Sequence, residues 1–194
     1  MHKYHNNLKI LESRSDPGFT LLELMVTVSL IAFMGLLAAT SFDTGSWLAH
    51  QRLKGAAREL STNLQKTRMN AVKENTRWDI TFNTADNTYT LRSAGPDNDF
   101  DAVADNVTDV TASLPANGSG VVFGFGRANK DVNNDSLPAS PVTFTGSRVV
   151  FSPRGLANVA GTCYLTNDHG DSMAVVVRIN GSVDIRRWNG SKFE

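Results

Sequence analysis

Residues 16–42 read DPGFTLLELMVTVSLIAFMGLLAATSF, and this stretch decides how the chain is organised. From Phe19 to Phe42 it holds 24 predominantly apolar residues, with Glu23 as the one charged side chain. At about 1.5 Å of rise per residue, a helix of this length crosses a hydrocarbon core of about 30 Å. The pattern therefore predicts a membrane-spanning helix over residues 19–42.

Glu23 is the unusual residue of this stretch. An ionised carboxylate inside a bilayer costs several kcal/mol, so such residues are usually paired and functional. The segment before the stretch carries Lys3, Lys9 and Arg14, which favour a cytoplasmic N-terminus and place everything after Phe42 outside. We therefore expect Glu23 to find a cationic partner near the cytoplasmic end of the span.

The run Gly18-Phe19-Thr20-Leu21-Leu22-Glu23 resembles the class III signal of type IV pilins and type II secretion pseudopilins. The resemblance implies that residues 1–18 are a leader peptide. It also implies that a prepilin peptidase cuts after Gly18 and N-methylates Phe19, and that Glu23 is an assembly contact. Cleavage would create an α-amine with an ordinary pKa of about 8, which is mostly protonated at neutral pH. Glu23 then has two candidate cations, the amine of its own chain and that of an adjacent subunit.

The composition excludes several kinds of protein. The formal net charge is zero, so no overall basic bias points to nucleic acid or anionic lipid. Cys163 is the one cysteine, which rules out an internal disulfide and a cysteine-based zinc site. The C-terminal cysteine pair common in major type IV pilins is therefore absent as well. A chain of 194 residues has room for one modest domain beyond the apolar stretch.

An amphipathic helix is expected from about Ser46 to Glu74. Apolar residues recur there at helical spacing, with Met69 and Val72 at the edge of the stripe, and the stripe consists of Ala49, Leu53, Ala56, Leu60, Leu64 and Ala71. Joined to the apolar stretch, this helix would form one rod of about 85 Å over residues 19–74. Gly45 is the point where a kink is expected, because glycine weakens a helix.

Beyond Arg77 the period changes to that of β-strands. Trp78, Ile80 and Phe82 alternate with polar residues that include Asp79, and a turn leads to Tyr89 and Leu91. Further strands are predicted at Val121–Phe125, Val142–Phe144, Arg148–Phe151, Thr162–Leu165, Met173–Ile179 and Val183–Trp188. Asn180-Gly181 is the strongest hairpin signal in the chain.

The chain is therefore expected to have an α+β fold, in which a long N-terminal helix packs on an antiparallel β-sheet domain. The predicted parts are the leader 1–18, the membrane-spanning half of the helix 19–42, its amphipathic half 43–75 and the globular domain 76–194. Within the domain, residues 93–116 are poor in apolar side chains and are expected to form an excursion outside the core.

This order of elements, together with Phe151-Ser152-Pro153-Arg154-Gly155, resembles the H-type minor pseudopilins and FimT-like minor pilins. The resemblance implies a structural subunit of a type II secretion pseudopilus or a type IV pilus, and no enzyme. The implied partners are other pseudopilins or pilins, the prepilin peptidase, the inner-membrane assembly platform and the lipid bilayer. The implied location is the bacterial inner membrane in a single pass, with the C-terminal domain in the periplasm and later in a filament that faces the cell exterior.

Calcium is the one cofactor that the sequence suggests. Alternating aspartates, as at the start of an oxygen-ligand calcium loop, occur at Asp97, Asp99, Asp101 and Asp105. Ala102 and Thr108 stand where an EF-hand requires glycine and glutamate, so an EF-hand is excluded. The alternatives are a less regular calcium site and a solvated acidic loop. A weaker candidate of the same kind follows at Asp131, Asn133 and Asp135.

DNA binding is the alternative function, because FimT-like minor pilins include proteins that bind DNA during uptake. Their C-terminal Gly-Arg-x-Arg pattern is broken here, since Gly181 is followed by Ser182-Val183-Asp184. A local basic patch remains at Arg178, Arg186, Arg187 and Lys192. Arg186 and Arg187 are adjacent on a predicted strand and point to opposite faces, which argues against a basic stripe and against DNA as a partner.

Catalytic motifs are weak throughout the chain. Asp168-His169 is explained by a polar turn, without a serine or cysteine partner in the pattern. Gly124-Phe125-Gly126 does not complete a dinucleotide fingerprint, and Gly118-Ser119-Gly120 is not a nucleophile elbow. The sequence therefore predicts no enzymatic activity.

Overall fold

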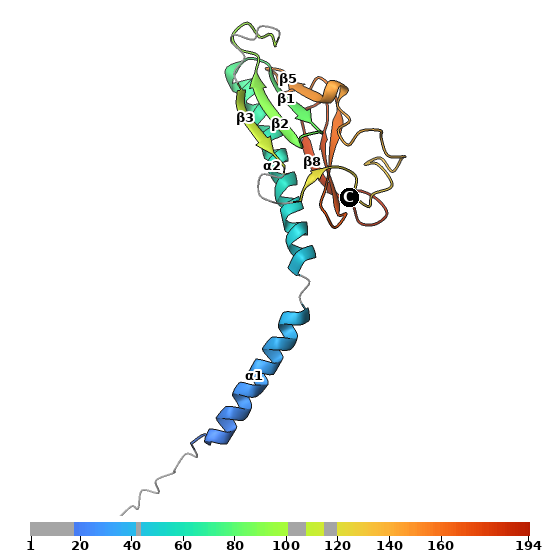
Figure 1. Ribbon diagram of the computed structural model, residues 1–194. Coiled ribbons are helices and arrows are strands. Elements are labelled where there is room, and N and C mark those ends of the chain that lie inside the picture. Colours follow the sequence, from blue (N-terminus) through green and yellow to red (C-terminus); the bar gives the residue numbers. More distant parts are fainter. Residues whose placement is uncertain (1–17, 42–43, 101–107, 115–119) are drawn as a thin grey trace, which may run out of the picture. The chain divides into compact units, whose positions relative to one another are not determined.

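The computed structural model describes residues 18–41, 44–100, 108–114 and 120–194, which fall into two units, Met1–Asp43 and Thr44–Glu194 (Figure 1). The first unit contains the helix α1 (Leu21–Ser41). The second contains the helix α2 (Thr44–Glu74), the strands β1 to β8 and a short 3-10 helix, η1 (Thr145–Ser147).

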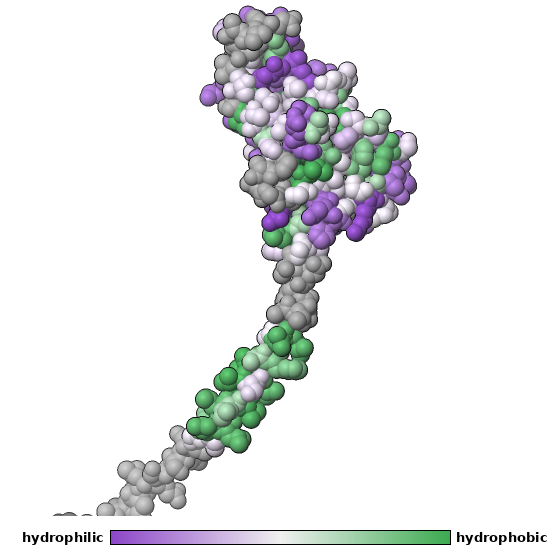
Figure 2. Space-filling model, in the orientation of Figure 1, coloured by the Kyte–Doolittle hydropathy of each residue, from purple (hydrophilic) through white to green (hydrophobic). Residues whose placement is uncertain are grey.

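The face of α1 that Figure 2 shows is largely apolar, and the helix sequence carries Glu23 as its one charged side chain. Its aliphatic, methionine and phenylalanine side chains from Leu21 to Leu37 have exposed fractions between 49% and 77%. A helix that is apolar on all sides is typical of one buried in a larger protein assembly or in a bilayer. The hydroxyls of Thr27 and Ser29 donate to carbonyls one turn earlier, at 2.9 and 2.7 Å, so they need no water.

No helix in the described part of the chain is both long and apolar enough to cross a membrane. The membrane span over residues 19–42 therefore stays a prediction. Residues 42 and 43, between α1 and α2, and residues 1–17 of the predicted leader lie outside the described residues. The single rod and the kink near Gly45 stay predictions too, and Gly45 itself lies in the first turn of α2.

Helix α2 presents a narrow apolar stripe to the rest of its unit. The stripe consists of the buried side chains of Ala49, Leu53, Ala57, Leu60, Leu64 and Ala71, whose spacing puts them on one helix face. Ala57 occupies the place predicted for Ala56, whereas Met69 and Val72 are 69% and 51% exposed and lie outside the stripe. The helix ends at Glu74 as predicted, because Asn75 takes the left-handed conformation that stops helices, with φ of 52°.

Two four-stranded antiparallel sheets pack with α2. The first has the order β3-β2-β1-β5 and is built from β1 (Trp78–Asn83), β2 (Thr88–Ser93), β3 (Thr108–Ser113) and β5 (Arg148–Phe151). The second has the order β4-β6-β7-β8 and is built from β4 (Val122–Phe123), β6 (Gly161–Thr166), β7 (Ser172–Val177) and β8 (Val183–Arg187). Helix α2 contacts strands of both sheets (Figure 1). The predicted α+β arrangement is confirmed, with two sheets where one was expected.

One hydrophobic core joins the helix and the two sheets. Its fully buried members include Leu53, Leu60 and Leu64 of α2, Ile80, Leu91, Val149 and Phe151 of the first sheet, and Leu165 and Val175 of the second. The alternation predicted for β1 is confirmed, since Trp78, Ile80 and Phe82 all belong to this core. The hairpin predicted at Asn180-Gly181 is also present, and the amide of Arg178 donates to the carbonyl of Ser182 at 3.0 Å.

Two predictions about strands were wrong. Strand β3 lies inside residues 93–116, which were expected to stay outside the core. It is an edge strand rich in threonine, and Val110 and Ala112 suffice to pack it against the core. Residues 142–144 form no strand, because only Val142 makes an isolated bridge. The Phe144 ring stacks on that of Phe82 at 5.5 Å between centroids, and the chain then turns into η1.

Asp79 is buried, although the strand pattern placed it on the polar side of β1. Its carboxylate side chain has no exposed surface, and Arg92, its partner in the β1–β2 register, donates to it from Nε and Nη2 at 3.3 and 2.7 Å. Arg148 Nε lies 2.5 Å from Asp79 Oδ2, and the Phe100 ring covers the Arg148 guanidinium at 4.1 Å. Two guanidinium groups thus replace the water that this carboxylate loses on folding.

We expect Asp79→Asn to lower the free energy of unfolding by about 3 kcal/mol, because it leaves two guanidinium groups around a neutral amide. Asp184→Asn is the matched control, since it removes a carboxylate from the exposed pair with Arg178 and should cost less than about 1 kcal/mol. Urea unfolding of the full chain in detergent, followed by near-UV circular dichroism, measures both. Equal losses in the two variants would contradict a special role for the buried carboxylate.

Candidate functional site

The predicted processing site lies directly before α1 and is accessible. Gly18, Phe19 and Thr20 have no regular secondary structure, and the Phe19 side chain is 82% exposed. Among the described residues, no atom beyond the chain neighbours of Gly18 lies within 4 Å of where a Cβ on it would be. The Gly18–Phe19 peptide bond therefore lies before the first turn of α1, next to an exposed Phe19 side chain.

Thr20 caps α1, and sequence reasoning missed this role. The amide of Glu23 donates to Thr20 Oγ1 at 3.2 Å, and the amide of Leu24 donates to the Thr20 carbonyl at 3.1 Å. The sequence did carry a signal for this cap, because Thr-x-x-Glu is the pattern of a capping box. Its two halves, Thr20 and Glu23, are the first and fourth residues of Thr20-Leu21-Leu22-Glu23.

Glu23 lies in the first turn of α1. A carboxylate is stabilised there by the positive end of the helix dipole and by amide groups that have no partner within the helix. Within the described residues, no ion pair involves Glu23. The first turn of α1 therefore supports this charge locally.

The predicted calcium residues are only partly described. Asp97 and Asp99 lie within the described residues. Asp97 Oδ1 accepts a hydrogen bond from the amide of Asp99 at 3.0 Å. The Asp99 carboxylate lies 3.8 Å from the Arg77 guanidinium. Asp101 and Asp105 lie outside the described residues. Within the described ranges, no three histidine, cysteine, aspartate or glutamate side chains form a group that could hold a metal ion. Calcium at this loop stays a prediction.

The weaker acidic candidate is explained by a turn. Asp131 Oδ1 accepts the amides of both Asn133 and Asp135 at 2.8 Å, so this carboxylate oxygen stabilises its own loop. Such a local bond between an aspartate and the backbone that follows is a common turn motif.

The four basic residues considered for DNA do not form one patch. Arg178 is paired with Asp184 at 2.5 Å, and Arg186 donates to the carbonyl of Val132 at 2.9 Å. Arg186 and Arg187 lie opposite Ala174 and Met173 of β7, which belong to two different clusters of buried residues. The two arginines therefore point to opposite faces as predicted, and Lys192 lies beyond the strand.

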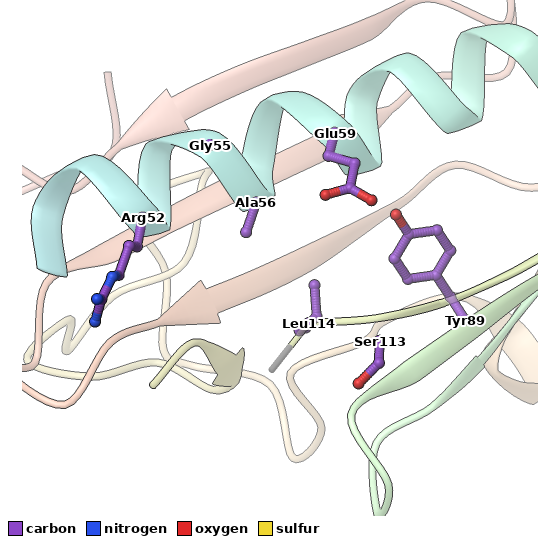
Figure 3. A pocket seen from close by; sticks show the side chains of 7 residues that line it. All are labelled: Arg52, Gly55, Ala56, Glu59, Tyr89, Ser113 and Leu114. Atoms are coloured by element: carbon purple, nitrogen blue, oxygen red, sulfur yellow. The ribbon is translucent and has the colours of Figure 1, made fainter. Parts of the chain in front are cut away.

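A pocket between α2 and the first sheet gathers polar groups (Figure 3). Arg52, Gly55, Ala56 and Glu59 line it from the helix, and Tyr89 of β2, Ser113 of β3 and Leu114, which follows β3, line it from the other side. The Tyr89 hydroxyl accepts a hydrogen bond from Asn63 Nδ2 at 2.8 Å, and burial raises the pKa of Tyr89 to about 12. A phenol of this pKa stays neutral at physiological pH and is a poor base.

Cys163, His169 and His50 are further side chains with reactive groups in the described part of the chain. Burial raises the pKa of the Cys163 thiol well above its usual value, which disfavours the nucleophilic thiolate. His169 lies in the turn predicted for it, where its amide donates to Asn167 Oδ1 at 3.1 Å. His50 Nδ1 lies 3.5 Å from Asp171 Oδ2, a contact that ties α2 to the turn between β6 and β7.

Two models of known protein families match the chain. The family model of the type II transport protein GspH matches residues 56–182, which include most of α2 and most of both sheets. The chain belongs to the GspH family. A second model, the prokaryotic N-terminal methylation motif, matches residues 13–39 and so includes Gly18, Phe19 and Glu23. The resemblance inferred from the sequence is confirmed: the protein is a minor pseudopilin or minor pilin, a structural subunit that assembles with other pilin-like subunits.

Two solved structures are similar to this member of the GspH family. The minor pseudopilin EpsH from the type 2 secretion system of Vibrio cholerae has 11% sequence identity and a TM-score of 0.48, over 70% of this chain and 97% of that one. The type IV minor pilin FimU of Pseudomonas aeruginosa has 13% identity and a TM-score of 0.48, over 76% of this chain and 96% of that one. No curated protein sequence matches the chain at a significant level.

We expect Thr20→Val to fray the start of α1, at a cost of about 1 kcal/mol, because valine has the shape of threonine but no capping oxygen. Thr20→Ser keeps the oxygen and is the matched control. Amide hydrogen exchange of Glu23 and Leu24, measured in detergent micelles, should become faster in Thr20→Val alone. Equal exchange rates in both variants would show that the Thr20 hydroxyl does not cap the helix.

Proposed function

We propose that this GspH-family subunit is made as a precursor, cut after Gly18 by a prepilin peptidase and N-methylated at Phe19. The observation that carries the proposal is the exposed Gly18–Phe19 bond immediately before a helix that is capped from Thr20 onward. A bond outside regular secondary structure and beside an exposed side chain is accessible to a peptidase. The match to the N-terminal methylation motif over residues 13–39 supports the same reading.

Cleavage changes the electrostatics around Glu23. The precursor has an uncharged amide at Phe19, whereas the mature chain has an α-amine with an ordinary pKa of about 8. In a water-poor setting an ammonium group and a carboxylate attract strongly, provided that their hydrogen bonds are satisfied. Glu23 would then receive the amine of an adjacent subunit and set the register of the growing filament.

The apolar α1 would hold the precursor in the inner membrane before assembly. The basic residues ahead of Gly18 orient it with the N-terminus in the cytoplasm and the domain from Thr44 onward in the periplasm. From there an inner-membrane assembly platform would move it into a short filament. The filament is a secretion pseudopilus or a type IV pilus, and both fit the chain equally well.

The mass of the mature protein tests the processing step. We expect purification from cells that express prepilin peptidase to yield a chain that begins at N-methyl-phenylalanine 19, because Gly18 and Phe19 form the exposed bond before α1. Intact-mass spectrometry measures this directly. The Gly18→Leu variant is the control and should keep its leader. A mature chain with any other first residue would overturn the proposal.

Two variants separate the structural and the assembly roles of Glu23. Glu23→Ala removes the charge and the capping group, whereas Glu23→Gln removes the charge and keeps a side chain that can complete a capping box. We expect both variants to be inserted and cleaved normally and to co-assemble poorly with a partner subunit, measured by crosslinking in membranes. Normal assembly of Glu23→Gln would show that the carboxylate acts only on its own helix.

A further inference from the structure

A groove runs along α2 on the side that faces the β7–β8 hairpin. Arg68, Met69, Val72 and Lys73 line it from the helix, and Gly181 and Val183 line it from the hairpin. Met69 and Val72 are among the most exposed apolar side chains of α2, at 69% and 51%. Exposed apolar residues that line a concave site are typical of a surface that binds a partner.

The floor of the groove is formed where three segments meet. Arg68 Nε donates to the Gly155 carbonyl at 2.9 Å, which ties α2 to the turn that ends the Phe151–Gly155 motif. Gly181 of the hairpin has φ of 77°, and a Cβ on it would collide with the Gly155 carbonyl and with Arg68 Nε. The hairpin can therefore approach the helix this closely only because residue 181 is glycine. Two motifs that have no part in processing thus build a pre-formed groove.

The charges at the groove are of one sign. Arg68 and Lys73 are the charged residues that line it, and both are cations. Of the carboxylates next to lining residues along the chain, Asp184 pairs with the Arg178 cation at 2.5 Å. Glu74 accepts a hydrogen bond from the uncharged Trp78 Nε1 at 2.9 Å, so the two lining cations are in excess over this one carboxylate. A ligand with carboxylates at its edges would complement this surface, and one with ammonium groups would be repelled.

We propose that this groove docks a helix of another pilin-like subunit whose aliphatic stripe is edged by aspartate or glutamate. Gln65, Met69 and Val72 form a ridge along α2, beside which a second helix can pack its own ridge. Val183 supplies the opposite wall, and Gly181, which has no side chain, leaves room between them. The class of partner rests on the proposed function, whereas the groove depends neither on cleavage after Gly18 nor on Glu23.

Two labelled helical peptides test the proposal. Both carry leucines at positions i, i+3 and i+7, flanked by glutamates in one peptide and by lysines in the other. Fluorescence anisotropy measures their binding to the full chain in detergent micelles, with empty micelles as the blank. We expect the glutamate peptide to bind at least about tenfold more tightly. Equal binding of the two, tighter binding of the lysine peptide or no binding of either would overturn the proposal.

Matched variants locate the binding. Met69→Glu should weaken binding of the glutamate peptide by at least about tenfold, whereas Leu48→Glu, at an exposed apolar residue near the other end of α2, should not. Lys73→Glu should shift the preference toward the lysine peptide, and Arg58→Glu, the same charge change outside the groove, should leave it unchanged. Similar losses in the control variants would refute the groove as the site. Near-UV circular dichroism confirms that each variant is folded.

This experiment is separate from the tests of processing. Peptide binding to the groove does not depend on removal of residues 1–18. A mature chain with another first residue would therefore not affect the proposal for the groove. Conversely, a groove that binds neither peptide would leave the intact-mass result and the Glu23 variants unaffected. The two proposals can therefore fail independently.

Discussion

The apolar stripe of α2 is the surface on which both sheets depend. Leu53, Leu60 and Leu64 are fully buried, and the helix contacts β1 of the first sheet and β7 and β8 of the second. Truncating a buried leucine to alanine typically costs about 2–5 kcal/mol, so three such residues represent much of the stability of a small domain. Without this stripe, the inner faces of both sheets would lose a shared apolar partner, which is why the domain can be regarded as one core built on one helix.

Sequence patterns correctly predicted the elements whose conformation depends on residues close together in the chain. The helical stripe, the end of α2 at Glu74 and the hairpin at Asn180-Gly181 each follow from a few neighbouring residues. Strand β3 was not predictable in this way, because it has few apolar residues and is a strand only through its pairing with β2. The burial of Asp79 could not be predicted for a similar reason, since Arg148, which pairs with it, and Phe100, which covers Arg148, come from other parts of the chain.

In the candidate site, too, features set by neighbouring residues could be predicted from the sequence, and features set by distant residues could not. The motif around Gly18, Phe19 and Glu23 could be recognised from the sequence because it is a short linear segment, which lies within the matched N-terminal methylation motif. The cap at Thr20 could also be predicted from the sequence, because Thr20 and Glu23 have the spacing of a capping box. The groove beside Met69 could not be read from sequence at all, since it exists only where α2, the Gly155 turn and the β7–β8 hairpin meet.

The Thr20 cap bears on what removal of the predicted leader would change in α1. The first hydrogen bonds of α1, from Glu23 and Leu24 back to Thr20, all lie beyond Phe19. Removal of residues 1–18 would therefore break none of them, and the helix would need no rearrangement when the leader is lost. The proposed cut would then be a pure change of charge on an unchanged backbone. A subunit processed in this way would keep the first turn of α1 as it was made and would gain one ionised nitrogen.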